Sequence, residues 1–156
     1  MKSDNHPRLF CDVMLGRLAR RLRLLGLDVR YEPSVRGLQA YRRAKADRRL
    51  FLTRHQKLKG LPDVLLLESE NTDRQLEEVR EVLGIPQEKP RSESQALSRC
   101  PVCNEVLKKI SRDQARPAVP FYIYQIHNDF RRCPQCQRVF WPGSHVQKML
   151  KKQGGK

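Results

Sequence analysis

The sequence predicts an α/β domain with a parallel β-sheet flanked by helices, followed by a small second module organised by cysteines. Three observations support this prediction. Short apolar runs alternate with helical periodicity through the first ninety residues, an order that favours a parallel sheet with helices on its faces. The segment 87–98, QEKPRSESQALS, is polar and contains a proline, as linkers do. Two C-x-x-C motifs then follow, with 29 residues between them.

The first strand and helix lie within residues 9–27, LFCDVMLGRLARRLRLLGL. Residues 9–11 form an apolar run typical of a buried strand, in which Cys11 is expected as a buried thiol. A helical period follows at once, and Gly26 is placed to end it. Asp12 therefore stands where a strand passes into a helix. It can cap the helix, or it can belong to a ligand site, since ligands collect at the carboxyl ends of parallel strands. The expected apolar face of the helix comprises Leu15, Leu18, Ala19, Leu22 and Leu25.

Three further strands complete the expected sheet. They are predicted at residues 28–31, 50–53 and 64–67, where aliphatic and aromatic residues are bounded by turn residues. An amphipathic helix is expected at residues 38–45, between the first two of these strands.

The last helix of this domain is predicted to begin at Thr72. Gln75 stands three residues further on, which is a capping-box signal. Gly84 and Pro86 end the helix, so we place the α/β domain at residues 1–86 and the linker at residues 87–98. The residues expected to be buried on this helix are Leu76, Val79 and Leu83.

The two C-x-x-C motifs predict a metal site in residues 99–156. Each motif bends the chain so that two thiolates face one point, and four thiolates complete a tetrahedral Zn²⁺ shell with Zn–S of about 2.3 Å. Such a shell leaves no position for water, so the zinc would be structural. A redox role is the alternative, although a redox C-x-x-C usually occurs singly, at the start of a helix. The four expected ligands are Cys100, Cys103, Cys133 and Cys136.

The spacing suits a zinc ribbon whose long excursion, including residues 121–126, contributes strands. Phe140 and Trp141 could form the small core of this ribbon or stack on nucleic acid bases. His145 is expected to be a surface or capping residue, because four thiolates already fill the shell. The chain ends in a basic tail, MLKKQGGK.

The charge pattern indicates a polyanionic partner. The net charge is +15, with +11 in residues 1–60, −5 in residues 61–95 and +9 in residues 96–156. Two basic blocks around an acidic one are typical of nucleic-acid-binding proteins, and a basic protein with solvated arginines is the alternative. No G-x-G-x-x-G, P-loop or G-x-S-x-G motif is present, so no nucleotide cofactor is expected.

No targeting or membrane segment is expected. The first residues, MKSDNHPR, are polar, and the longest aliphatic run, residues 64–67, is far shorter than the ~18 residues of a membrane span. We therefore expect a cytoplasmic protein with no membrane partner and with reduced cysteines.

Taken together, these motifs resemble the Mut-seven C-terminal RNase domain family, a PIN-like nuclease fold followed by a zinc ribbon. The resemblance runs from Leu9 to about Met149. It implies descent from a metal-dependent endoribonuclease whose acidic residues at the strand ends bind divalent cations, with Asp12 at the position of the first acid. The motifs are FCDVMLGRLARRLRLLGLDV, RLFLTR, RQLEEVREVLGI, SRCPVCN and CPQCQRVFWPGSH, in that order.

Two acidic positions of the family are missing from this chain. No acid lies between Glu32 and Asp47, and the family pattern L-T-R-D reads LTRH at residues 52–55. One carboxylate beside Arg36 and Arg54 is a poor site for Mg²⁺, which prefers several oxygen ligands. Glu32 or Asp63 could still complete a Mg²⁺ or Mn²⁺ site. His55 could instead bind Mn²⁺ or Zn²⁺, or act as a general base.

We therefore expect an RNA-binding protein in which catalysis is weakened or lost, with Asp12 and His55 as the candidate catalytic residues. The expected partner is RNA, structured or within a ribonucleoprotein. The alternatives are an active metal-dependent endoribonuclease that uses Asp12, and a basic module that docks an acidic protein or a ribonucleoprotein. The arginines expected to contact RNA are Arg17, Arg20, Arg21, Arg42, Arg43, Arg54, Arg131 and Arg132.

Overall fold

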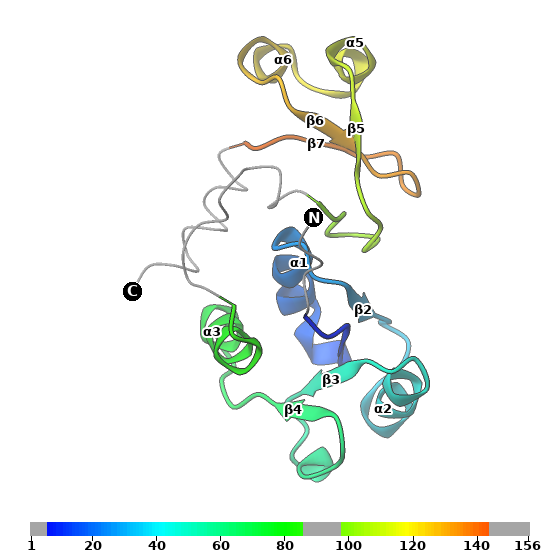
Figure 1. The fold of residues 1–156 in the computed structure, drawn as a ribbon, viewed down its shortest axis with the longest axis vertical. Helices are drawn as coiled ribbons and strands as arrows, with labels where there is room; N and C mark the ends of the chain where they lie inside the picture. The colour runs from blue at the N-terminus through cyan, green and yellow to red at the C-terminus, as the bar shows by residue number, and fades with distance from the viewer. Residues whose placement is uncertain (1–5, 86–97, 144–156) are drawn as a thin grey trace. The chain divides into compact units, whose positions relative to one another are not determined.

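The computed structural model describes residues 6–85 and 98–143. The chain divides into two compact units. The N-terminal unit contains a four-stranded sheet, and the C-terminal unit contains both C-x-x-C motifs (Figure 1). Most of the predicted linker, His145 and the basic tail lie outside the described residues.

The sheet of the N-terminal unit is parallel throughout. Its strands are β1 (Leu9–Cys11), β2 (Val29–Tyr31), β3 (Leu50–Thr53) and β4 (Val64–Leu66), in the order β2-β1-β3-β4. β1 lies in the middle and is completely buried, and Cys11 is a buried thiol as predicted. The expected α/β class is confirmed.

Helices connect these strands across both faces of the sheet. They are η1 (Val13–Leu15), α1 (Gly16–Leu24), α2 (Gly37–Ala46), η2 (Gln56–Leu58) and α3 (Thr72–Leu83). The β1-to-β2 and β2-to-β3 connections run in opposite directions along the sheet. Because such crossovers are right-handed, α1 and α2 lie on opposite faces.

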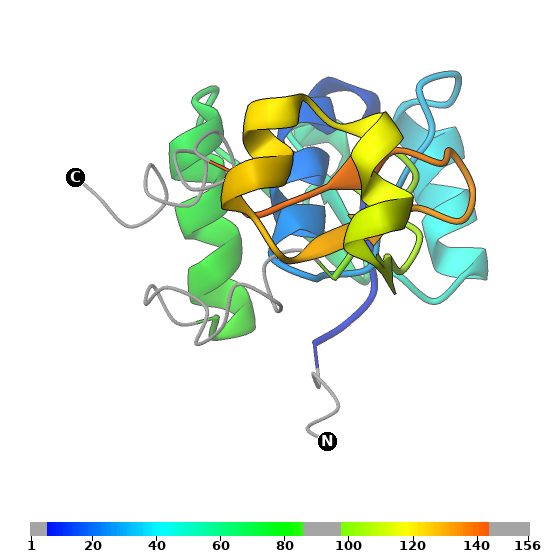
Figure 2. The same cartoon turned by 90° about the horizontal axis from the view of Figure 1, so that it is seen from above.

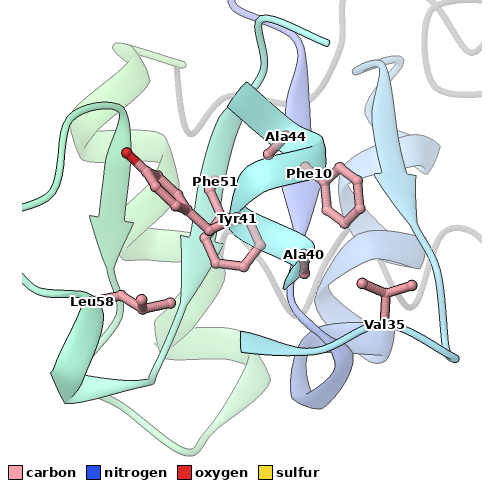
Figure 3. Close-up of a cluster of buried hydrophobic side chains, with 7 residues drawn as sticks. All are labelled: Phe10, Val35, Ala40, Tyr41, Ala44, Phe51 and Leu58. Atoms are coloured by element: carbon pink, nitrogen blue, oxygen red, sulfur yellow. The ribbon is translucent and has the colours of Figure 1, made fainter. Parts of the chain in front are cut away.

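The face under α2 is an aromatic core (Figure 3). The rings of Phe10 and Phe51, from neighbouring strands, are 5.9 Å apart between centroids, and the Tyr41 ring meets Phe51 edge-on at the same distance. The Tyr41 hydroxyl donates to the Pro62 carbonyl at 2.8 Å, so its one polar atom has a partner. Val35, Ala40, Ala44 and Leu58 complete the cluster.

The opposite face carries α1. The Tyr31 hydroxyl donates to the Val13 carbonyl at 2.8 Å, which fixes the start of this helical segment over β2. Leu25 is only half-buried, because the helix already ends at Leu24 and Gly26 takes a φ of 92°. The other predicted apolar positions, Leu15, Leu18, Ala19 and Leu22, are at most 1% exposed.

α3 begins at Thr72, as predicted, but a different residue caps it. Asn71, not Thr72, is the N-cap, and its side chain accepts from the backbone N–H of Arg74 at 3.2 Å. Asn is a strong N-cap residue, and its preference outweighs the Thr72 signal. Gly84 ends the helix as predicted, with a φ of 68°. Leu76 and Val79 are buried, and Leu83 is half-buried.

Ion pairs hold the amino ends of the strands together. Arg49, just before β3, binds Asp47 and also Asp28, the residue before β2, with 2.7 Å between Arg49 Nη1 and Asp28 Oδ1. Arg30 reaches the same Asp47 carboxylate at 3.3 Å. Because Arg49 is only 10% exposed, these pairs are partly shielded from solvent and contribute more than surface pairs do.

The C-terminal unit contains a three-stranded antiparallel sheet in the order β5-β6-β7. Figure 2 shows its helices α5 and α6 side by side. The core comprises Ala115, Ile123 and Phe130, and Trp141 packs against it. Its elements are β5 (Lys108–Ile110), α5 (Arg112–Ala115), η3 (Arg116–Ala118), α6 (Phe121–Ile126), β6 (Phe130–Arg132) and β7 (Val139–Phe140).

The prediction of a strand at residues 121–126 is wrong. These aromatic and β-branched residues have high strand propensity, but they form α6. The Pro120 carbonyl accepts from the backbone N–H groups of Ile123 and Tyr124, both at 3.0 Å, which starts the helix. Only one side chain of the segment, Ile123, is buried, and one helical turn is enough to place it against the core.

Candidate functional site

Asp12 is the buried centre of the carboxyl edge of the parallel sheet. It follows β1 and is the N-cap of η1, where its Oδ1 accepts from the Val13 N–H at 2.8 Å. Its own N–H donates to the Leu52 carbonyl at 2.9 Å, which extends the β1–β3 pairing by one residue. Asp12 is 0% exposed. The capping role of Asp12, one of the two considered from sequence, is therefore present in the structure.

Two further donors reach this carboxylate from distant segments. The backbone N–H of Gly37, at the start of α2, donates to Oδ1 at 3.1 Å, and the Thr53 hydroxyl, at the end of β3, donates to Oδ2 at 2.7 Å. With the Val13 N–H, three donors hold the two oxygens of a buried carboxylate. Hydrogen bonds to an ionised group are roughly twice as strong as neutral ones, so this network fixes three segments against each other.

His55 lies next to this network. Among the described residues, no hydrogen bond joins His55 to Asp12. Its backbone N–H donates to the Thr53 hydroxyl oxygen at 3.0 Å. Its exposed ring lies beside Gly37, where an added Cβ would be 3.6 Å from His55 Cδ2. Gly37 has a φ of 59°, a conformation that favours glycine. The ring therefore lies beside the Asp12 network and is exposed to solvent.

Of the two carboxylates considered as substitutes, one is engaged by arginines and the other lies at the opposite edge of the sheet. Glu32 follows β2 at the same edge, but Arg30 and Arg43 hold its two oxygens at 2.5 and 2.6 Å. Asp63 precedes β4, so in a parallel sheet it lies at the opposite edge from Asp12. Among the residues described, the cysteines form the one group of three or more potential ligands close enough to hold a metal ion.

The end of β4 carries acids that sequence reasoning overlooked. Glu68 and Glu70 follow β4 at the same edge as Asp12, and both are exposed. Glu70 lies 3.8 Å from Arg54, whose Nη2 also donates weakly to the Glu68 carbonyl at 3.5 Å. The signal was present, since both acids come directly after a predicted strand.

The four cysteines of the C-terminal unit converge as predicted. Their sulfur atoms all lie within 4.8 Å of one another, and Cys100 Sγ is 3.8 Å from Cys136 Sγ. A tetrahedral shell with Zn–S of about 2.3 Å has an S–S edge of about 3.8 Å. All four are free cysteines, so no disulfide competes for the thiols. The donor set therefore fits a metal ion, consistent with zinc.

The two C-x-x-C turns have the same local geometry. In each, the N–H of the second cysteine points at the sulfur of the first, at 3.4 Å for Cys103 and 3.5 Å for Cys136. In each, the residue after the second cysteine turns left-handed, with a φ of 67° at Asn104 and 65° at Gln137. This residue closes the turn by donating to the first cysteine's carbonyl, at 2.8 and 2.9 Å.

The thiols differ in acidity before any metal binds. Burial raises the pKa of Cys103 to about 12, with the neighbouring cysteines adding to the effect. Burial also opposes ionisation of Cys136, but hydrogen bonds from the backbone and side chain of Arg138 and from Cys133 and Cys103 lower its pKa to about 6. Cys136 is therefore the readier thiolate of these two, and metal binding must displace a proton from Cys103.

The arginines expected to contact RNA fall into two groups. Arg17, Arg20 and Arg42 are exposed and form no ion pair with another described residue. Others already have partners, since Arg21 pairs with Asp73, Arg43 with Glu32, Arg54 with Glu70 and Arg131 with Asp129, while Arg132 donates to the Gln114 carbonyl at 3.3 Å.

A family model described as the Mut7-C RNAse domain matches residues 7–153, nearly the whole chain, which confirms the resemblance inferred from the motifs. No curated protein and no solved structure matches the chain. Within residues 6–85 and 98–143, no helix is long and apolar enough to cross a membrane.

Proposed function

The chain belongs to the Mut7-C RNAse domain family, and from this premise we propose that it binds RNA and that its metal-dependent nuclease activity is weak or lost. The family itself indicates an RNA-related, nuclease-like function. The cysteine cluster serves in this proposal as a structural zinc site. Zinc would supply folding free energy to a C-terminal unit whose core contains only a few buried apolar residues.

One observation supports the proposed loss of catalysis, namely that Asp12 is buried and that its oxygens already accept hydrogen bonds. A nuclease metal needs carboxylate oxygens that are open to it, and Mg²⁺ prefers near-octahedral oxygen ligands. The Asp12 oxygens already accept three hydrogen bonds, and the residue is 0% exposed. Glu32 is engaged by arginines, and Asp63 lies at the other edge. These residues do not fit a Mg²⁺ site, so Asp12 acts here as a structural acid.

RNA binding is supported by the cations that form no ion pair with another described residue. Arg17 and Arg20 project from α1, and Arg42 from α2 on the other face of the sheet. A cation without a carboxylate partner can neutralise a phosphate without first losing an ion pair. We therefore assign the strongest phosphate contacts to these three, and weaker ones to the paired arginines.

A cleavage assay tests the loss of catalysis. A structured RNA is incubated with wild type, Asp12→Asn and His55→Ala, in Mg²⁺, in Mn²⁺ and in chelator. We expect no cleavage above background in Mg²⁺ by any of the three. Robust Mg²⁺-dependent cleavage that Asp12→Asn abolishes would overturn the proposal. Cleavage that survives chelator but not His55→Ala would assign catalysis to the histidine, whose exposed ring lies beside the Asp12 network.

A binding experiment tests the RNA partner. Arg17→Ala/Arg20→Ala should weaken RNA binding and reduce the slope of log affinity against log salt by about 0.7–0.9 per lost contact. Lys57→Ala/Lys59→Ala removes the same charge from exposed residues of the η2 loop and is the matched control. Equal losses in both variants would indicate a general charge effect. Equal affinity of the wild type for RNA and for poly-glutamate would point to an acidic protein partner instead.

A further inference from the structure

We propose that an exposed aromatic face of α6 is a stacking platform for the unpaired bases of single-stranded RNA, an inference that rests on the RNA binding proposed above. The face, called here the α6 face, consists of Phe121, Tyr122 and Ile126. Their exposed fractions of 63%, 64% and 69% are the largest among the exposed large apolar side chains of the described residues. Because three large apolar side chains exposed on one short helix are uncommon on a surface without a partner, they indicate a binding site.

The α6 face is held in place by the core beneath it. Ile123, on the inner side of the helix, is 8% exposed and packs with Ala115 and Phe130. Helical spacing puts Tyr122 and Ile126 one turn apart, and it puts Phe121 one turn from Tyr124 on the adjoining side of the helix. The rings are therefore carried by a fixed backbone, so little ordering would be needed when a base stacks on them.

Fixed positive charge lies around Tyr124, one helical turn from Phe121. The Arg112 guanidinium is 4.2 Å from the centre of the Tyr124 ring, and that of Arg116 is 5.7 Å from it. Arg112 donates to the Tyr124 carbonyl at 2.7 Å, to Asn128 Oδ1 at 2.9 Å and to the His127 carbonyl. All three acceptors are neutral, so they hold the guanidinium in position without cancelling its charge.

The antiparallel sheet of the C-terminal unit adds two positively charged side chains that lie directly across from each other. Lys108 on β5 lies directly opposite Arg132 on β6, on the same face of the sheet as Ile110 and Phe130, which pack in the core with α5 and α6. Arg132 donates to the neutral Gln114 carbonyl at 3.3 Å. Like charges directly opposite in an antiparallel pair are destabilising. A phosphate group at this position would offset that repulsion.

The combination of rings and cations favours single-stranded RNA over other occupants. Residues 98–143 contain eight Lys/Arg and three Asp/Glu, so the occupant should be an anion. An acidic peptide would satisfy the cations but not the flat rings, and a duplex keeps its bases stacked on each other. Unpaired bases with their phosphates satisfy both features, as in other proteins that bind single strands.

The test uses the full-length, zinc-loaded protein and two fluorescent probes. One is an unstructured single-stranded RNA of about 12 nucleotides, within the usual ~4–16 of such sites, and the other is a blunt RNA duplex of equal length. Phe121→Ala/Tyr122→Ala is compared with Tyr122→Phe, which keeps the ring, and with Val106→Ala, which removes an apolar side chain that is 55% exposed in the same unit. Circular dichroism and zinc content confirm that each variant is folded.

We expect the double variant to lose at least about tenfold in affinity for the single strand and less than twofold for the duplex, with an unchanged salt slope. Tyr122→Phe and Val106→Ala should bind as wild type does. Wild-type affinity in the double variant, while the wild type binds RNA, would overturn the inference and leave the proposed function standing. An equal loss of affinity for both probes would also overturn it. If the wild type bound neither probe, the proposed function itself would fail.

Discussion

The backbone N–H of Gly37 donates to Asp12 Oδ1 at 3.1 Å, which ties the start of α2 to the end of β1 across 25 residues of sequence. The resemblance of the sequence motifs to the family implies an acid at the start of the second helix. In this chain the same region supplies a hydrogen-bond donor to the first acid. The two residues thus form part of a structural network at the edge where a nuclease would place a metal.

The structural role of Asp12 predicts a large loss of stability on its removal. Asp12→Ala should lower the free energy of unfolding by about 3–5 kcal/mol, because the donors of Val13, Gly37 and Thr53 would lose their acceptor inside the protein. Thr53→Val removes one of these bonds and should cost about 1–2 kcal/mol. Urea unfolding followed by circular dichroism measures both. A cost below about 1 kcal/mol for Asp12→Ala would contradict the structural role.

The cysteine cluster predicts one zinc ion per chain. Elemental analysis of the purified protein should find that ratio, and Cys133→Ser should lose the metal, since three thiolates bind zinc much less tightly. Limited proteolysis of this variant should cut within residues 98–143 and leave residues 6–85 protected. Cys11→Ala removes a thiol outside the cluster and should retain the zinc. Full zinc content in Cys133→Ser would rule out the Cys₄ site.

Because Gln137 has a left-handed backbone conformation, we expect valine at this position to lower the stability of the unit and glycine not to do so. Gln137→Val should destabilise the zinc-bound unit by about 1–2 kcal/mol, because a β-branched side chain is strained at a φ of 65°. Gln137→Gly should be neutral or stabilising, despite loss of the Gln137 side-chain bond to the Pro134 carbonyl. Gln135→Val, in the same turn without a positive φ, is the control. Thermal unfolding followed by circular dichroism measures all three, and similar shifts in the two valine variants would contradict the prediction.

The ion pairs of Asp47, at the amino edge of the sheet, and of Glu32, at the carboxyl edge, predict a loss of stability in acid. Hydrogen bonds from Arg49 hold the pKa of Asp47 below its ordinary value of 3.8, although burial opposes this. Burial opposes ionisation of Glu32 too, but Arg30 and Arg43 outweigh it and lower its pKa. A lowered folded-state pKa stabilises the fold above the ordinary pKa, and this contribution disappears as the pH falls through the folded value.

The variant that isolates this effect is Asp47→Asn. It should be less stable than wild type near neutral pH, and the difference should shrink toward zero as the pH falls below 3.8. Asp63→Asn removes an exposed acid that pairs with no other described residue, so its stability should follow wild type at every pH. Urea midpoints across the pH range measure this. A constant gap between Asp47→Asn and wild type would show that the ionised carboxylate is not the cause.

The sequence by itself determined the features that depend on local pattern. The apolar run at residues 9–11 and the period from Leu15 to Leu22 specify a buried strand and an amphipathic helix, because burial on one face requires those spacings. The two C-x-x-C motifs specify the cysteine cluster for a similar reason. A two-residue spacer already brings each pair of thiols to one point, so the tertiary structure has only to join two pairs.

Only the tertiary structure decided what surrounds these features. The donors to Asp12 come from Gly37 and Thr53, whose distances along the chain, 25 and 41 residues, give no local signal. Residues 121–126 have the propensity of a strand but form a helix, because a single buried side chain, Ile123, can reach the core in one turn. Glu32 could serve a metal by its position, yet Arg30 and Arg43 engage it. Which partner a charged or buried polar group finds is a property of the packed chain, because folding brings the competing partners together from distant positions.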